Sequence, residues 1–286
     1  MFRRMAVVVV LGVLAAGCAR EVEPAREGEG PRIVALSPAI AIILKDLGVE
    51  GRIVGRHGYD MVLDPDVPIC GDQAGIDYEQ LLTVRPTHVL TQWGARPPPE
   101  RLVRLAERHG WVLVDVSMLS LDEVAQATRR LARDFAPERV GVADELTGFR
   151  PPAGVFKGRV LLLATGSPPA ALGPGSFHQD LLERLGATAA VSEGSAYIVL
   201  DAEDVLRLDP EGIIVLASRA GEGEGVVRRG EAALAALGPF GSLPIRAVET
   251  GRVAVIEHPL ALMPGTSLVE IRQAMAEILV GWAAGP

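Results

Sequence analysis

The chain has 286 residues, which is enough for two modest domains or one large one. Its 28 basic and 36 acidic residues give a formal net charge of −8, and this argues against an electrostatic grip on nucleic acid, because such binding needs clustered cations. With 49% apolar residues the chain is too hydrophobic to be mainly disordered, and its 2 cysteines are too few for a disulfide framework or a cysteine-rich metal site.

The N-terminus has the pattern of an export signal. Arg3 and Arg4 precede an apolar run, residues 5–16, that is too short to span a membrane but suits the apolar region of a signal peptide. We predict a signal peptide over residues 1–17. Its ending, LAAGC, resembles a bacterial lipobox with Ala15 where Leu is usual, and this implies a lipid on Cys18. An ordinary cleaved signal is the alternative.

Residues 18–31 are rich in Glu, Gly and Pro and show no apolar periodicity. Such a segment buries too little surface to fold, so we predict a lipidated cysteine followed by a flexible tether. The body of the protein would then lie in the periplasm or on the outer face of the cell membrane. With Cys18 lipidated, Cys70 has no partner for an intramolecular disulfide.

From Arg32 onward, apolar runs predict strands that alternate with amphipathic helices. Strands are predicted at residues 32–36, 51–55, 89–91, 112–116, 159–163, 213–217 and 252–256. One helix begins after Ser37 and ends at Gly48, and another begins after Ser176 and ends at Gly186. Both serines are predicted N-caps. Alternating strands and helices predict parallel sheets covered on both faces.

An internal repeat divides this body in two. Residues 77–90 (DYEQLLTVRPTHVL) align without a gap on residues 201–214 (DAEDVLRLDPEGII). Each segment predicts a short helix that begins at its Asp, ends near its Pro and leads into a buried strand. The repeat favours duplication over a chance likeness of strand–helix units. Two like lobes form a cleft, and ligands prefer clefts.

Between the halves, residues 121–135 have apolar residues at helical spacing, and a further helix is predicted from Pro137 toward Phe149 before Pro151 and Pro152. We therefore predict an α/β fold of two similar lobes, residues 32–120 and 158–286. Each lobe is a mostly parallel sheet with flanking helices, and a helical linker over residues 121–157 bridges them.

Motifs for catalysis are missing from the sequence. It contains no phosphate-binding loop and no HExxH metal helix, and residues 173–177 (GPGSF) do not satisfy the nucleophile-elbow pattern. The acidic loop at residues 221–225 (GEGEG) lacks the glycine spacing of a dinucleotide site. We predict that the protein is not an enzyme and has no cofactor or metal of its own.

Five segments of the chain resemble the substrate-binding proteins of bacterial ABC importers, in the group that handles iron-siderophores, haem and cobalamin. They are residues 32–55 (RIVALSPAIAIILKDLGVEGRIVG), 72–90 (DQAGIDYEQLLTVRPTHVL), 173–187 (GPGSFHQDLLERLGA), 200–215 (LDAEDVLRLDPEGIIV) and 248–279 (VETGRVAVIEHPLALMPGTSLVEIRQAMAEIL). The bridge departs from that pattern, because residues 138–157 are short and contain Pro151 and Pro152.

The resemblance implies capture of a corrinoid or iron chelate in the cleft and delivery to a permease and, through it, an ATPase. The protein would be a monomer when free and would close little on its ligand. Trp93 and Tyr59 in a chain with 4% aromatic residues favour a flat ring, and cobalamin is the first expectation. A siderophore, with Arg56, Arg96 and Arg219 as candidate contacts, and haem stay open, as does a non-transporting sensor of the same fold.

The resemblance also implies that Glu79 and Glu203 meet arginines of the permease. Their equivalence in the repeat supports this role, and two exposed first-turn glutamates are the alternative. Loops after strands and helix N-termini should face the cleft. They nominate as ligand-binding residues Ser37, Pro38, His57, Tyr59, Trp93 and Gly94 in the first lobe and Phe177, His178, Tyr197, His258 and Met263 in the second. His57 or His178 would ligate a ligand's iron or cobalt only if the two face each other across the cleft.

Overall fold

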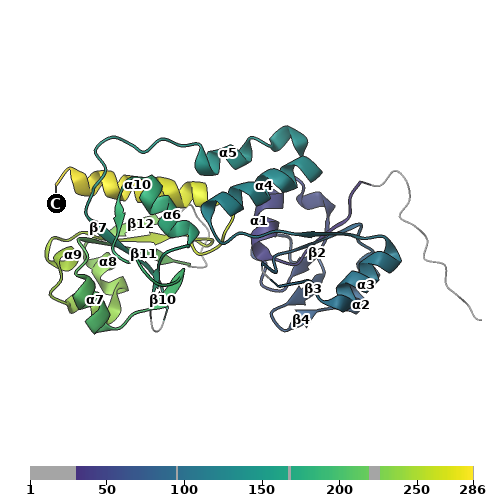
Figure 1. Cartoon of the computed structure of the whole chain (residues 1–286), viewed down its shortest axis with the longest axis horizontal. Coiled ribbons are helices and arrows are strands. Elements are labelled where there is room, and N and C mark those ends of the chain that lie inside the picture. The colour runs from purple at the N-terminus through teal and green to yellow at the C-terminus, as the bar shows by residue number, and fades with distance from the viewer. Residues whose placement is uncertain (1–29, 95, 167–168, 219–225, 286) are drawn as a thin grey trace, which may run out of the picture.

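The computed structural model describes residues 30–94, 96–166, 169–218 and 226–285. It confirms the predicted fold class, with two α/β lobes that are joined through helices (Figure 1). The predicted signal peptide, the proposed lipid site at Cys18, residues 18–29 of the tether, Arg219 and the loop at 221–225 lie outside the described residues. Within the described ranges no helix is both long and apolar enough to cross a membrane.

The first sheet has the strand order β4-β3-β2-β1-β5-β6. All of its neighbours pair in parallel except β4, which is antiparallel to β3. The strands are β1 (Ile33–Ala35), β2 (Ile53–His57), β3 (Ile69–Asp72), β4 (Gly75–Ile76), β5 (His88–Thr91) and β6 (Val112–Asp115). The helical segments are α1 (Pro38–Asp46), η1 (Glu50–Arg52), α2 (Tyr78–Val84) and α3 (Glu100–His109).

The two faces of this sheet belong to different hydrophobic clusters. Ile33 of β1 packs in the same cluster as α1, whereas its neighbour Val34 packs with Leu81 of α2 and Leu102 of α3. Alternate residues of a strand point to opposite faces. The short apolar run of β1 is therefore buried on both sides, as a central strand of a parallel sheet requires.

The second sheet has the order β10-β8-β7-β11-β13-β12, with β9 paired to β7. β7, β9, β11 and β13 pair in parallel, and β8, β10 and β12 join through antiparallel pairs, so this sheet is more mixed than the first. Its strands are β7 (Arg159–Ala164), β8 (Ala170–Leu172), β9 (Thr188–Ala189), β10 (Tyr197–Val199), β11 (Gly212–Ala217), β12 (Val226–Arg229) and β13 (Val253–Glu257). The helical segments are α6 (Phe177–Arg184), α7 (Ala202–Leu208), α8 (Glu231–Ala236), η3 (Gly238–Ser242), α9 (Arg246–Glu249) and α10 (Leu268–Ala283).

The repeated segments fold into matching units. Helices α2 and α7 each have 7 residues, and each begins at an N-cap Asp, Asp77 or Asp201, whose side chain accepts a hydrogen bond from the backbone N–H three residues on. Each helix ends at a non-glycine residue in the left-handed region, Arg85 with φ 45° and Asp209 with φ 37°. An arginine at the start of the central strand supports this end in both lobes. Arg32 donates to the carbonyl of Arg85, and Arg159 donates to that of Asp209.

The two predicted serine N-caps behave differently. Ser176 caps α6, because its side chain accepts a hydrogen bond from the backbone N–H of Gln179 at 3.1 Å. Ser37 occupies the N-cap position of α1 without capping it, and its Oγ donates instead to Oε1 of Gln92 at 2.6 Å. The Ser37 hydroxyl thus donates to the residue that follows β5 instead of accepting a hydrogen bond from a backbone N–H of α1.

The bridge between the lobes is not one long helix. It consists of α4 (Leu121–Phe135), a short turn η2 (Pro137–Arg139), α5 (Val142–Thr147) and a non-helical crossing to β7. The further helix predicted from Pro137 toward Phe149 is therefore shorter than expected. Pro137 removes a backbone donor and breaks the helical ladder after α4.

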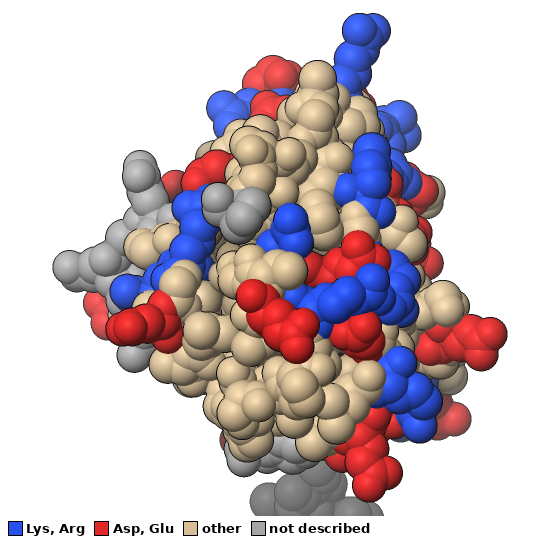
Figure 2. Space-filling view, turned by 90° about the vertical axis from the view of Figure 1, so that its left-hand side faces the viewer, with Lys and Arg blue, Asp and Glu red and all other residues tan. Residues whose placement is uncertain are grey.

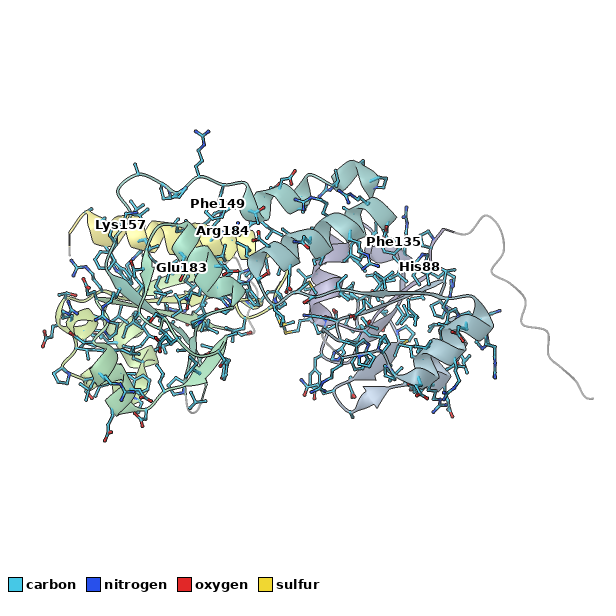
Figure 3. The ribbon with its side chains drawn as sticks, in the orientation of Figure 1. His88, Phe135, Phe149, Lys157, Glu183 and Arg184 are labelled. Carbon is cyan, nitrogen blue, oxygen red and sulfur yellow. The ribbon has the colours of Figure 1, made fainter. Side chains whose placement is uncertain are left out.

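Helix α4 spans the junction of the lobes. At its start, the backbone N–H of Leu121 donates to Asp180 of α6 at 2.9 Å, and Asp122 pairs with Arg184 of α6 at 2.7 Å. At its end, the ring of Phe135 packs edge-on against His88 of β5, with ring centroids 5.2 Å apart (Figure 3). One helix therefore contacts the second lobe at its N-terminus and the first lobe at its C-terminus.

A single hydrophobic cluster continues from one lobe into the other. It includes Ile33 and Ile40 of the first lobe together with Val160 and Leu268 of the second. Thr266 of the second lobe also donates a hydrogen bond to Asp46 at the end of α1. Helices α4, α5 and α10 lie along one side of both sheets (Figure 1). The lobes are therefore held together by packed apolar side chains on that side.

Candidate ligand-binding site

A cavity of about 180 Å³ lies at the carboxyl ends of the parallel strands of the first sheet. In open α/β sheets, ligands bind beyond the carboxyl ends of the strands. Two of the residues predicted to bind ligand, His57 and Trp93, contribute to its wall. The full lining is Leu36, His57, Gly71, Asp72, Gly75, Ile76, Gln92 and Trp93.

Trp93 is placed by the chain that leaves β5. Its backbone N–H donates to Oδ1 of Asp115 at 2.9 Å, and the hydroxyl of Thr91 donates to the same oxygen at 2.7 Å. Asp115 at the end of β6 therefore anchors the turn after β5. The indole Nε1 of Trp93 is buried and has no hydrogen-bond partner among the described residues. A buried N–H without an acceptor is costly.

His57 is the last residue of β2. In the sheet, β1 lies between β2 and β5, the strand that leads to Trp93. The Nδ1 of His57 accepts a hydrogen bond from the backbone N–H of Tyr59 at 3.1 Å, so the neutral ring carries its proton on Nε2. Burial lowers the pKa of His57, and this effect outweighs the negative charges of Asp72 and Asp60, which act to raise it. At neutral pH the ring is therefore an uncharged donor. The ring of Tyr59 is 60% exposed, and its centroid lies 5.7 Å from that of His57; Tyr59 itself does not line the cavity.

This hydrogen bond opposes metal ligation by His57. To bind a metal through Nε2, the ring would have to carry its proton on Nδ1, where it would face the N–H of Tyr59. Across the described ranges, no group of three or more His, Cys, Asp or Glu side chains is placed to hold a metal ion. The cavity is lined by N–H-bearing side chains, by the carboxylate of Asp72 and by the apolar Leu36 and Ile76.

The remaining first-lobe candidates do not line the cavity. Ser37 is 4% exposed and acts through Gln92, a residue that sequence reasoning did not nominate. Pro38 is half-buried at the first position of α1. Gly94 is exposed and follows Trp93 with φ +65°, a conformation that favours glycine.

The second-lobe histidines are held inside their own lobe. His178 is 2% exposed, and its Nε2 donates to the carbonyl of Ala261 at 2.7 Å. Burial lowers the pKa of His178 to about 4, so its ring is neutral. His258 is 7% exposed, its Nδ1 accepts from the N–H of Leu260 at 3.0 Å, and its Nε2 donates to Glu270 at 3.0 Å. Of His57 and His178, only His57 lines the cavity.

The other second-lobe candidates are spread apart. Phe177 is half-buried, with its ring centroid 4.3 Å from that of His178, and Met263 is half-buried in the segment before α10. Tyr197 lies on β10, at the edge of the sheet, and is 56% exposed. None of these three lines the first-lobe cavity.

A larger cavity, of about 430 Å³, lies where α1 and α5 meet residues 258–270. Charged residues of both signs line it, and its two cations already have partners. Lys45 donates to the carbonyl of Val62, and Arg139 donates to that of Asp46. The smaller cavity is the better candidate for a ligand site, because it combines the carboxyl ends of the strands, an aromatic wall and an unpaired buried donor.

No protein-family model and no curated protein matches the sequence. Solved structures do match. The periplasmic vitamin B12 binding protein BtuF of Vibrio cholerae is 19% identical, with a TM-score of 0.67 over 89% of this chain and 98% of that one. The chain has the fold of the periplasmic binding proteins. The periplasmic heme-binding proteins HutB of Vibrio cholerae and RhuT of Roseiflexus sp. RS-1 have TM-scores of 0.66 and 0.65 at 19% and 20% identity. They align with 88% and 89% of this chain and with 98% and 100% of their own.

The two helices of the repeat present equivalent side chains to solvent. Glu79 of α2 and Glu203 of α7 are exposed at matching positions. Three residues later, Leu82 and Leu206 are 39% and 41% exposed. Residues three apart on a helix share a face, so each lobe shows one glutamate and one leucine side by side. Elsewhere, at the end of the second lobe, acidic and basic side chains are interspersed (Figure 2).

Proposed function

We propose that the protein is the extracytoplasmic substrate-binding component of an ABC importer and that it captures cobalamin or another corrinoid between its lobes. The observation that carries this is the first-lobe cavity in a two-lobed binding-protein fold, where the indole N–H of Trp93 is buried without a partner. Of the three structurally similar proteins named above, two are heme-binding proteins and one is a vitamin B12 binding protein. A binding role needs no nucleophile or general base, and we infer that the protein is not an enzyme.

The size of the cavity determines how a ring-shaped ligand would sit. At about 180 Å³ it is smaller than the roughly 300–1,000 Å³ of pockets that enclose a small molecule. It therefore receives one edge of the ring, and the rest of the ligand lies between the lobes. Haem is the alternative occupant, since the exposed phenol of Tyr59 lies beside His57, which lines the cavity.

We also propose that α2 and α7 dock onto the permease. Glu79 and Glu203 would each meet a cationic side chain, and Leu82 and Leu206 would be covered at the same time. A partner built from two like subunits fits such a duplicated surface, because each lobe offers the same pair. Export by residues 1–17, a lipid on Cys18 and a monomeric free state complete the proposal.

Binding is tested by titrating the purified protein with cyanocobalamin and, separately, with hemin, following tryptophan fluorescence with inner-filter correction. Saturable quenching by sub-micromolar cyanocobalamin is expected, because a ring edge in the cavity contacts Trp93. The quenching should be largely lost in Trp93→Phe. Trp111→Phe is the matched control, since Trp111 stacks on His109 away from the cavity.

Calorimetry with the same two ligands decides the outcome independently of fluorescence. Heat of binding for cyanocobalamin supports corrinoid capture, and heat for hemin alone moves the assignment to haem. If neither macrocycle binds, the proposal of a flat-ring ligand is wrong, and ferric siderophores become the class to test.

A further inference from the structure

Three side chains with N–H groups line the cavity at the ends of two strands. Trp93 carries an indole N–H that is buried and has no partner among the described residues. His57 contributes Nε2–H, because its Nδ1 accepts from Tyr59. Gln92 contributes its Nε2 amide, because its Oε1 already accepts from the hydroxyl of Ser37 at 2.6 Å. All three donors are uncharged at neutral pH.

Asp72 is the one charged residue in the wall. It is the last residue of β3, and its Oδ1 accepts from the backbone N–H of Ala74 at 2.7 Å, which holds the carboxylate in place. Gly58, the residue after His57, lies close to Asp72, because a Cβ at Gly58 would be 3.1 Å from that of Asp72. The lining contains no lysine or arginine, so within the described chain the cavity offers an anion no cationic partner.

A primary carboxamide and a carboxylate differ in the hydrogen-bonding groups that they offer to the residues of this cavity. The carboxamide has a carbonyl that accepts and an NH₂ group that donates, whereas the carboxylate only accepts. The carbonyl matches the three N–H donors, and the NH₂ group matches Asp72. Asp72 is exposed, and a ligand carboxylate placed against it would meet a like charge, which is unfavourable at close range.

We propose that this cavity selects a primary carboxamide on the edge of the captured ring and discriminates against a carboxylate, with Asp72 as the discriminating residue. The inference rests on the proposed function. A corrin carries primary carboxamides around its edge and haem carries carboxylates, so the wall favours the corrin.

The test compares cyanocobalamin with its monocarboxylic acids, in which one peripheral carboxamide has been hydrolysed, by calorimetry at neutral pH. At least one monocarboxylic acid should bind about tenfold or more weakly than cyanocobalamin. In Asp72→Asn that difference should fall to about threefold or less, because Asn keeps an acceptor for Ala74 but loses the charge. Asp66→Asn is the matched control, an exposed aspartate nearby in sequence that is outside the cavity.

A second variant tests the donors. Gln92→Glu keeps an acceptor for Ser37 and removes the amide N–H groups, so cyanocobalamin should bind about tenfold more weakly.

The outcomes separate the inference from the function on which it rests. Equal binding of all the monocarboxylic acids and cyanocobalamin would overturn carboxamide selection and leave corrinoid capture standing. A difference that persists unchanged in Asp72→Asn would overturn the role of Asp72. Failure of cyanocobalamin to bind the unmodified protein would instead reject the proposed function.

Discussion

His178 shows how burial changes the chemistry of a residue that looks like a ligand in the sequence. The side chain follows a helix N-cap, as a cleft residue would, but its ring is 2% exposed and donates to Ala261. Removal from water disfavours the charged imidazolium, and the pKa falls from 6.5 to about 4. The residue therefore stabilises the loop at 258–267 as a neutral donor.

The lowered pKa of His178 predicts acid sensitivity. Above pH 6.5 neither folded nor unfolded protein binds this proton, and the residue causes no pH dependence. Between pH 6.5 and about 4 only the unfolded chain takes it up, so the free energy of unfolding falls as the pH falls, by about 3 kcal/mol in total.

Urea denaturation of wild type and His178→Gln at pH 7 and pH 4.5 measures this effect. Gln retains an N–H donor for Ala261 but does not titrate. The wild type should lose about 2 kcal/mol more than His178→Gln over that range. His109→Gln, at the end of α3, is the control and should follow the wild type. Equal losses in wild type and His178→Gln would contradict the assignment.

At the scale of elements, the duplicated unit carries the same backbone strain twice. Arg85 and Asp209 end α2 and α7 in the left-handed region, at φ 45° and 37°, which non-glycine residues adopt at a cost. The two differ in their side chains. Asp209 accepts from the backbone N–H of Arg246 at 2.9 Å and from its Nε at 2.8 Å, whereas the exposed side chain of Arg85 has no such contact among the described residues.

Glycine substitutions at these positions should therefore differ in effect. Arg85→Gly relieves strain without breaking a side-chain contact, and it should raise the free energy of unfolding by about 0.5–1 kcal/mol. Asp209→Gly gains the same relief but loses both bonds to Arg246, so it should gain less or lose stability. Thermal unfolding of both variants measures the difference, and a destabilised Arg85→Gly would show that its conformation is not strained.

At the scale of the whole molecule, the lobes present one docking unit each. The continuous core and the Thr266–Asp46 hydrogen bond join the two lobes, and α2 and α7 pack in the separate core of their own lobe. A permease that contacts both units gains from this connection, because the second contact forms without further loss of rotational freedom.

The docking proposal predicts separable effects on binding and transport. Glu79→Ala with Glu203→Ala should leave the affinity for cyanocobalamin unchanged, because neither glutamate lines the cavity. Ligand uptake by cells that carry only this copy should fall by about tenfold or more, since removing charges at an interface slows and weakens association. Glu107→Ala with Glu193→Ala, exposed glutamates outside the repeat positions, is the control. Undiminished uptake in the Glu79/Glu203 variant would favour a sensor over a transporter.

The sequence alone determined seven of the strands (β1, β2, β5, β6, β7, β11 and β13), helix α4, and the internal repeat with its helices α2 and α7 that begin at aspartates. Hydrophobic periodicity, proline and capping residues act over a few positions, so these features are readable locally. Trp93 and His57 were predicted for the same reason, since each stands at or just after the end of a strand.

Only the tertiary structure decided the polar partners. Ser37 donates a hydrogen bond to Gln92 and does not cap its own helix. The backbone N–H of Trp93 donates to Asp115, and the buried ring of His178 donates to the carbonyl of Ala261. Asp72 lines the cavity because β3, which it ends, pairs in parallel with β2. Each of these contacts joins residues distant in the chain, and sheet pairing and burial, which no local pattern encodes, bring them together.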